Sequence, residues 1–238
     1  MASLNIITAK SANPWHEITP DNKILSRDRE AVQIHNKKYS HLEEKRISLV
    51  DYPEPFIGNP NAKIYILLAN PGRSSESEKK HSSELKKRAL ESYIINNLRH
   101  NKLEYPFYLL DPKFREWHKG SEWWGKALKG LIEISSYEKI AQEVISVELY
   151  GYHSTRFEKG ICDKLVSLSS LYSYGLVEKA IKENKIILLP RAVGEWYKKV
   201  PALKSYDKCY LIATNRGITF TENTISPFAF KEIKKILR

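Results

Sequence analysis

The sequence predicts an α/β protein in which helices cover both faces of a mostly parallel, four-stranded sheet. Four short apolar runs rich in β-formers are the first observation, and the helix-like segments between them are the second. These runs span residues 64–68, 144–150, 185–189 and 209–213. The third observation is that polar residues, Pro or Gly follow each run. Alternating strands and helices are typical of a three-layer αβα domain. Because parallel strands end at one edge of a sheet, the residues that follow them should lie together.

The first run, 64–68, is apolar throughout, as expected of a strand buried on both faces. A turn signal follows it and supplies the first candidate site residues, Asn70, Pro71, Gly72, Arg73 and Ser74. The Asn70 amide could position a water or hold a carbonyl, and Gly72 permits close approach of the backbone to a ligand. A plain strand-to-loop turn is the alternative interpretation.

The second run, 144–150, contains a carboxylate, Glu148, between Val147 and Leu149. A charged group inside a buried strand is costly unless it is paired or hydrogen-bonded, so Glu148 is a candidate functional residue. An edge strand with Glu148 facing solvent is the alternative. His153 follows in the loop and could bind a phosphate or a carbonyl, although a single loop His is often an ordinary surface residue.

Further candidates come from the remaining strand ends and from an aromatic segment. Arg191 follows the third run, and Asn215 and Arg216 follow the fourth, where they could hold a phosphate or support a glycosidic transition state. A solvated turn is the alternative there. Phe107 and Tyr108 could stack on a nucleic-acid base, with core packing as the competing interpretation.

The helical segments and turn signals suggest two unequal parts of the chain. Residues 1–58 are expected to form an N-terminal arm and a helical extension packed on the main domain, which spans residues 59–238. Proline residues separate the extension from the first strand. Helices are expected at about 21–50, 84–97, 117–132, 164–182, 193–199 and 228–237.

Composition points to a polyanionic partner. The 238-residue chain carries a net charge of +11 together with Trp 5, Tyr 14 and Phe 7, which suits nucleic acid. The lysine clusters are short and spread along the chain, so a generic basic surface is the alternative. We therefore expect DNA, single- or double-stranded, to be the partner.

Several classes of protein are not supported. Cys162 and Cys209 are too few and too far apart for a disulfide framework or a zinc site. The amino terminus does not resemble a signal peptide, and no apolar run approaches the ~18 residues of a membrane span. The expectation is a cytoplasmic, monomeric protein without a metal or another cofactor.

Five segments, in order, resemble the uracil-DNA glycosylase superfamily, in particular its mismatch-specific uracil/thymine branch. They are LLANPGRS, YPFYLLDP, VELYGYHS, IILLPRAVGEWYK and LIATNRGITFTENTISP, and the resemblance covers residues 60–238. It implies that Asn70 positions the attacking water or steadies the sugar, and that Phe107 or Tyr108 stacks on the flipped base. Glu148 then takes the base-reading position, while Asn215 and Arg216 belong to the last motif.

The implied activity is hydrolysis of an N-glycosidic bond after base flipping, which leaves an abasic site. Two positions depart from the family pattern: the last motif lacks its usual His, and Glu148 replaces a base-reading Asn. An ionised carboxylate only accepts hydrogen bonds, so it favours an exocyclic amine such as cytosine N4. The substrate expectation is therefore a modified cytosine-type base in phage DNA, in an antiviral role.

Alternative interpretations remain open at this point. Glu148 could instead be the general base that activates water, which weakens the substrate inference. The protein could be a uracil-DNA glycosylase of base-excision repair, or a nucleic-acid-binding module without catalysis. A nucleotide-metabolising α/β enzyme is disfavoured because no Gly-rich phosphate loop follows the first strand.

Overall fold

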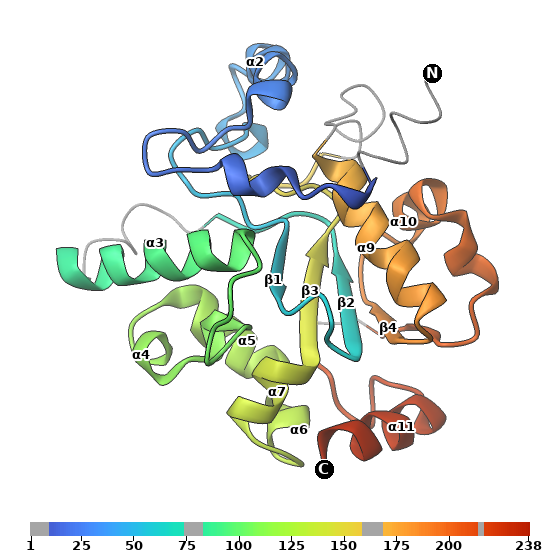
Figure 1. The fold of residues 1–238 in the computed structure, drawn as a ribbon. Helices are drawn as coiled ribbons and strands as arrows, with labels where there is room; N and C mark the ends of the chain where they lie inside the picture. The colour runs from blue at the N-terminus through green and yellow to red at the C-terminus, as the bar shows by residue number, and fades with distance from the viewer. Residues whose placement is uncertain (1–9, 74–82, 159–168, 214–216) are drawn as a thin grey trace.

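The computed structural model describes residues 10–73, 83–158, 169–213 and 217–238. Their centre is a five-stranded sheet with the strand order β1-β3-β2-β4-β5. Its strands are β1 (Phe56–Gly58), β2 (Ile64–Leu68), β3 (Val144–Glu148), β4 (Ile186–Leu189) and β5 (Cys209–Leu211). In Figure 1, α3, α4 and α5 lie to one side of the sheet and α9 and α10 to the other. The α/β class is therefore confirmed.

The four predicted strands pair in parallel, but the sheet has a fifth strand that the sequence analysis did not predict. β2 pairs in parallel with β3 and β4, and β4 with β5, whereas β1 pairs antiparallel with β3. β2 and β3 are buried along their whole lengths, which explains their unbroken apolar runs. The prediction of a four-stranded sheet is corrected to five strands, four of them parallel.

Most helices lie within the predicted segments, but Pro112–Arg115 and Tyr137–Glu143 lie outside all of them. The region predicted as one helix at 21–50 contains only a ten-residue helix, Arg29–Lys38, flanked by short 3-10 turns. The α-helices of the described residues are α2 (Arg29–Lys38), α3 (Glu84–Leu98), α4 (Pro112–Arg115), α5 (Lys119–Ala127), α6 (Lys129–Ile132), α7 (Tyr137–Glu143), α9 (Ser170–Lys182), α10 (Val193–Lys199) and α11 (Pro227–Leu237).

Helix starts have local causes in the sequence. The Ser83 hydroxyl accepts a hydrogen bond from the Lys86 amide at the start of α3. At α11, Ser226 caps in the same way and Pro227 occupies the first turn, where its missing N–H costs nothing. Both helices were predicted from the spacing of their apolar residues, and these caps determine where each one begins.

The N-terminal segment packs into the same core as the rest of the chain. Trp15 is fully buried, and an added Cβ on Gly151 would lie 2.9 Å from its ring. β1, which precedes the proposed boundary at residue 58, is part of the central sheet. Residues 10–58 are therefore joined to the main domain through the sheet as well as through side-chain packing. Among the described residues, no helix is long and apolar enough to cross a membrane.

Candidate active site at the carboxyl ends of the strands

The sheet brings three chain segments to one edge. β2 and β3 run parallel, so the loops that follow them leave the same edge. β1 runs the other way, so the residues before it reach that edge too. The Glu148 amide donates to Pro55 O at 2.8 Å, and the Glu54 amide donates to Gly151 O at 2.8 Å. These two bonds fix Glu54 beside the end of β3.

Glu148 is the most unusual group at this edge. The residue is 6% exposed, and its Oε2 is buried without a hydrogen-bond partner among the described residues. Burial raises the pKa of Glu148 well above its ordinary value, and Glu54 raises it further, while Arg191 has the opposite effect. The environment therefore favours the neutral acid, which can donate one hydrogen bond and accept another. A neutral Glu148 differs from the acceptor-only carboxylate expected from the sequence.

Glu54 is a site residue that the sequence analysis missed. Its carboxylate accepts a hydrogen bond from the Tyr108 hydroxyl, and its other oxygen lies 3.4 Å from His153 Nε2. Glu54 is the next cause after burial of the raised Glu148 pKa. We call Glu54 and Glu148 the acid pair. The only signal for Glu54 was its place between two prolines just before an apolar run.

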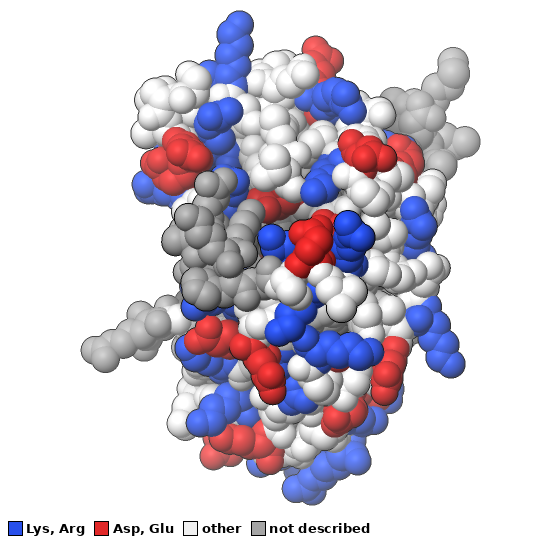
Figure 2. Space-filling model, turned by 90° about the vertical axis from the view of Figure 1, so that its left-hand side faces the viewer, with Lys and Arg blue, Asp and Glu red and all other residues white. Residues whose placement is uncertain are grey.

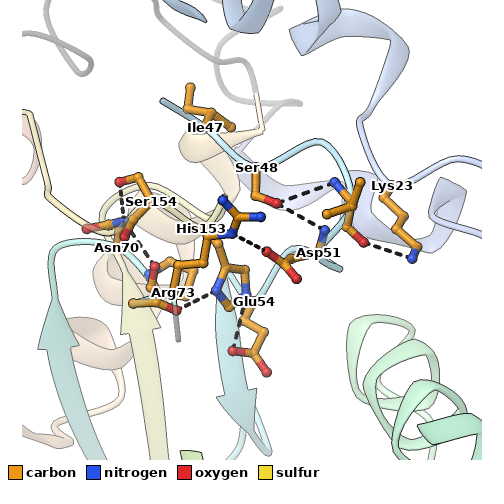
Figure 3. Close-up of polar contacts among 12 residues, drawn as sticks. Lys23, Ile47, Ser48, Asp51, Glu54, Asn70, Arg73, His153 and Ser154 are labelled. Carbon is orange, nitrogen blue, oxygen red and sulfur yellow. Dashed lines mark hydrogen bonds and ion pairs between the residues drawn. The ribbon is translucent and has the colours of Figure 1, made fainter. Parts of the chain in front are cut away.

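His153 connects the acid pair to the loop after β2. Its Nδ1 lies 2.6 Å from Gly72 O, and because a carbonyl only accepts, Nδ1 carries the proton. Its Nε2 faces a carboxyl oxygen of Glu54. Figure 3 shows His153 between Glu54 and Asn70.

Asn70 is held firmly by the loop after β3. Its amide nitrogen donates to Ser154 Oγ at 2.9 Å and to Pro71 O at 3.0 Å (Figure 3). With the nitrogen used in this way, the side-chain oxygen keeps its capacity to accept a hydrogen bond from water. This arrangement is compatible with the predicted role of Asn70 in positioning a water molecule.

His118 is a second residue that the sequence analysis missed. It lies between α4 and α5, and its Nδ1 is buried without a partner among the described residues. Burial lowers the pKa of His118, with Glu54 raising it and His153 lowering it, so it lies close to both groups. No local sequence pattern indicated it. His118 adds a neutral imidazole to the surroundings of the acid pair.

The structure brings together some of the predicted site residues and separates others. The strand ends bring together Glu148, His153, Asn70, Pro71 and Gly72. Arg191 is close enough to lower the pKa of Glu148.

The remaining candidates have other surroundings. Arg73 pairs with Asp51, with 3.0 Å between Nε and Oδ2. An added Cβ on Gly72 would meet nothing within 4 Å, so its backbone is open to approach. Ser74, Asn215 and Arg216 lie outside the described residues.

The two aromatic candidates are not equivalent, and neither presents a free ring. Phe107 is fully buried and packs edge-on against Trp124 with 4.8 Å between ring centroids. Tyr108 is also buried, and its hydroxyl is used by Glu54. In this structure Phe107 is a core residue, which is the competing interpretation given above. Tyr108 instead contributes through its hydroxyl.

The described residues at these strand ends form no cluster of metal ligands. Within the described ranges, no group of three or more His, Cys, Asp or Glu side chains could hold one. Figure 2 shows Lys and Arg interspersed with Asp and Glu on one face, so positive charge does not form a single patch there. The arrangement offers a buried acid, a partly buried carboxylate–imidazole pair and a fixed amide. Together these groups suit acid–base chemistry or hydrogen-bond recognition of a polar ligand.

Comparison with known proteins adds no family assignment. No protein-family model, no curated protein and no solved structure matches the chain.

Proposed function

We propose that the protein is a DNA glycosylase that flips a base and hydrolyses its N-glycosidic bond. The observation that carries the proposal is Glu148, a buried carboxyl with an unpartnered oxygen at a strand end. An unpartnered buried polar group is unfavourable unless a ligand completes its hydrogen bonding. The ordered resemblance of the strand ends to the uracil-DNA glycosylase superfamily and the net charge of +11 support DNA as that ligand.

The acid form of Glu148 suits base recognition better than water activation. Its O–H can donate to cytosine N3 while the other oxygen accepts from the exocyclic amine. The same group can donate to uracil O4 and accept from N3–H, so both pyrimidine edges are matched in hydrogen-bond pattern. The hydrogen-bond pattern of neutral Glu148 therefore does not choose between the two bases. We keep a modified cytosine-type base of phage DNA as the proposed substrate, with uracil as the alternative that the assay compares.

Other residues at the site suit the hydrolytic step. Asn70 holds the attacking water through its side-chain oxygen, since its nitrogen is already bonded to Ser154. Glu54 supplies negative charge close to the positive oxocarbenium-like sugar, and its carboxyl is oriented by Tyr108 and His153. Arg73 and Arg191 flank the loops and can contact phosphates.

A base-release assay tests this proposal. Oligonucleotides containing cytosine, uracil or hydroxymethylcytosine, together with phage DNA carrying glucosylated hydroxymethylcytosine, are incubated with the protein. Abasic sites are detected as alkali-sensitive breaks, and the released base is identified by mass spectrometry. We expect release of a modified cytosine and none of plain cytosine. If none of these DNAs yields a free base, the glycosylase proposal is wrong.

A further inference from the structure

A series of contacting aromatic rings leads from the candidate site to the surface of α3 and α4. It begins at His118, which lies close enough to Glu54 and His153 for both to shift its pKa. The ring of Trp117 packs edge-on against His118, with 5.6 Å between centroids, and against Phe114, with 6.0 Å. Trp117 is only half-buried. The surface that carries its ring is therefore next to the site.

The rings on this surface are held in place by hydrogen bonds and packing. Trp117 Nε1 donates to Lys113 O at 2.7 Å, and Lys113 Nζ donates to the Tyr93 hydroxyl at 2.9 Å. Tyr93, on α3, packs edge-on against the buried ring of Phe114 with 5.0 Å between centroids. Rings fixed in this way lose little conformational entropy when a ligand stacks on them.

Two lysine side chains contact the rings of this surface. Lys86 Nζ lies 5.7 Å from the centre of the Trp117 ring, and Lys113 Nζ lies 5.5 Å from the centre of the Tyr93 ring. On α5, by contrast, Lys126 pairs at 2.6 Å with a carboxylate of its own helix. An aromatic ring beside an ammonium group offers a nucleic-acid strand a stacking surface for a base and a partner for a phosphate.

The start of α3 extends this surface into solvent. Residues 83–89 are all exposed, and Figure 1 shows α3 extending away from the sheet. Helices in proteins gain most of their stability from a packed face, which this part of α3 lacks. Its charged residues are Glu84, Lys86, Lys87 and Arg88, so positive charge exceeds negative. The exposed start of the helix is therefore suited to an anionic chain.

We propose that Trp117, Lys86 and Lys113 bind an unpaired stretch of DNA beside the target base, with Trp117 stacked on a base and the two ammonium groups on phosphates. The inference rests on DNA being the substrate, as proposed above, and adds a binding surface outside the base pocket. In a duplex the base faces are covered by their neighbours, so a protein ring stacks most readily on an unpaired strand. This surface therefore favours single-stranded over fully paired DNA.

The first test measures binding of a fluorescein-labelled single strand, and of the same strand annealed to its complement, by fluorescence anisotropy. We expect Trp117→Ala to bind the single strand about 10-fold more weakly than the wild type, and Trp117→Phe to stay within about 3-fold. Binding of the duplex should change little in either variant. Wild-type affinity of Trp117→Ala for the single strand, or an equal loss on the duplex, would overturn the proposal.

The matched control for the ring is Tyr137→Ala. Tyr137 is also half-buried beside a cation, since the Arg115 guanidinium lies 4.0 Å from its ring centre. It begins α7, which leads into the amino end of β3, so it lies away from the strand ends of the site. Tyr137→Ala should bind both DNAs as the wild type does, and melting temperatures confirm that each variant is folded.

The second test uses the salt dependence of binding to the single strand. Lys86→Gln/Lys113→Gln should reduce the slope of log K against log salt by about 1.4, because each phosphate contact on a single strand contributes about 0.7. Both side chains are on the surface, so this variant should fold. The control is Lys234→Gln/Lys235→Gln on α11, where Lys234 Nζ lies 4.8 Å from the centre of the Phe230 ring. A slope equal to that of the wild type in Lys86→Gln/Lys113→Gln would overturn the proposal.

Both measurements report binding and need no release of a base. Absence of base release from every DNA, together with the expected loss of binding in Trp117→Ala, would overturn only the glycosylase proposal. Base release together with unchanged binding of the single strand by Trp117→Ala would overturn only this surface.

Discussion

Two buried carboxyl groups in this protein, Asp28 and Glu148, differ in what surrounds them. Asp28 is fully buried, and one of its oxygens accepts hydrogen bonds from the hydroxyls of Tyr152 and Ser169. Glu148 is almost as buried, and each carboxyl has one buried oxygen without a partner among the described residues, Asp28 Oδ1 and Glu148 Oε2. The charged groups that act on Glu148 are Glu54 and Arg191. Burial alone therefore does not distinguish a functional acid from a structural one.

The difference lies in which groups complete the hydrogen bonding. Asp28 links three distant segments of the chain, since Tyr152 also accepts from the Leu25 amide at 3.1 Å. Its hydrogen bonds hold the N-terminal segment to the loop after β3. Glu148 links nothing in this way, so its bonding capacity remains for a ligand. Asp28 should thus determine stability, and Glu148 should determine activity.

The largest expected effect is on catalysis. Glu148→Ala should lower kcat/KM for base release by about 10³-fold, because the base loses a paired hydrogen-bonding partner in a buried site. Glu148→Gln keeps one donor and one acceptor, so its rate should stay within about tenfold of the wild type. Single-turnover rates on the preferred oligonucleotide measure both. A loss as large in Glu148→Gln as in Glu148→Ala would instead identify Glu148 as a general base.

The next effect is on stability. Asp28→Ala leaves two buried hydroxyls without their acceptor and should lower the free energy of unfolding by about 2–4 kcal/mol. Urea denaturation measures the change, and Asp28→Asn, which keeps an acceptor oxygen, should lose less. Base release by the remaining folded protein should be unaffected. Equal unfolding energies for wild type and Asp28→Ala would show that this carboxyl does not hold the segments together.

A smaller effect concerns pH. The pKa of Glu148 is raised on folding by burial and by Glu54, so the folded protein binds this proton more tightly than the unfolded chain. Its contribution to stability is complete below the ordinary Glu pKa of about 4.3 and is lost as pH rises toward the folded value. As the pH rises from 5 to about 8, the free energy of unfolding of Glu148→Gln should therefore fall less than that of the wild type. If the melting temperatures of the two proteins change equally with pH across that range, the raised pKa of Glu148 is contradicted.

The smallest effect is expected at Tyr108. Tyr108→Phe removes the hydroxyl that orients Glu54 and should lower kcat by about tenfold while KM changes little. Tyr105→Phe, which removes a hydroxyl bonded to Glu138 on α7, is the matched control. An unaltered kcat in Tyr108→Phe would confine Tyr108 to packing.

Local patterns predicted the parallel strands, because apolar runs and turn residues are properties of short segments. They also predicted that Asn70, Glu148 and His153 would share an edge, which follows from parallel pairing. They did not predict β1, since a strand of three residues carries little pattern. Its Phe56 pairs with Val147, which is distant in sequence. Glu54 depends on β1, so it was missed for the same reason. The protonation of Glu148 depends on burial and on Glu54, which the sequence does not reveal.

The antiparallel pairing of β1 also determines when the acid pair can form during synthesis. Glu54 leaves the ribosome early, but the strand that holds β1 in place, β3, is made much later. Contacts between distant segments form slowly, after local helices and turns. The nascent chain therefore has no assembled acid pair until most of the sheet has been translated. A chain begun at residue 59 would lose Glu54 together with the buried Trp15 and Phe56, so the segment that supplies the second carboxyl of the site also completes the core.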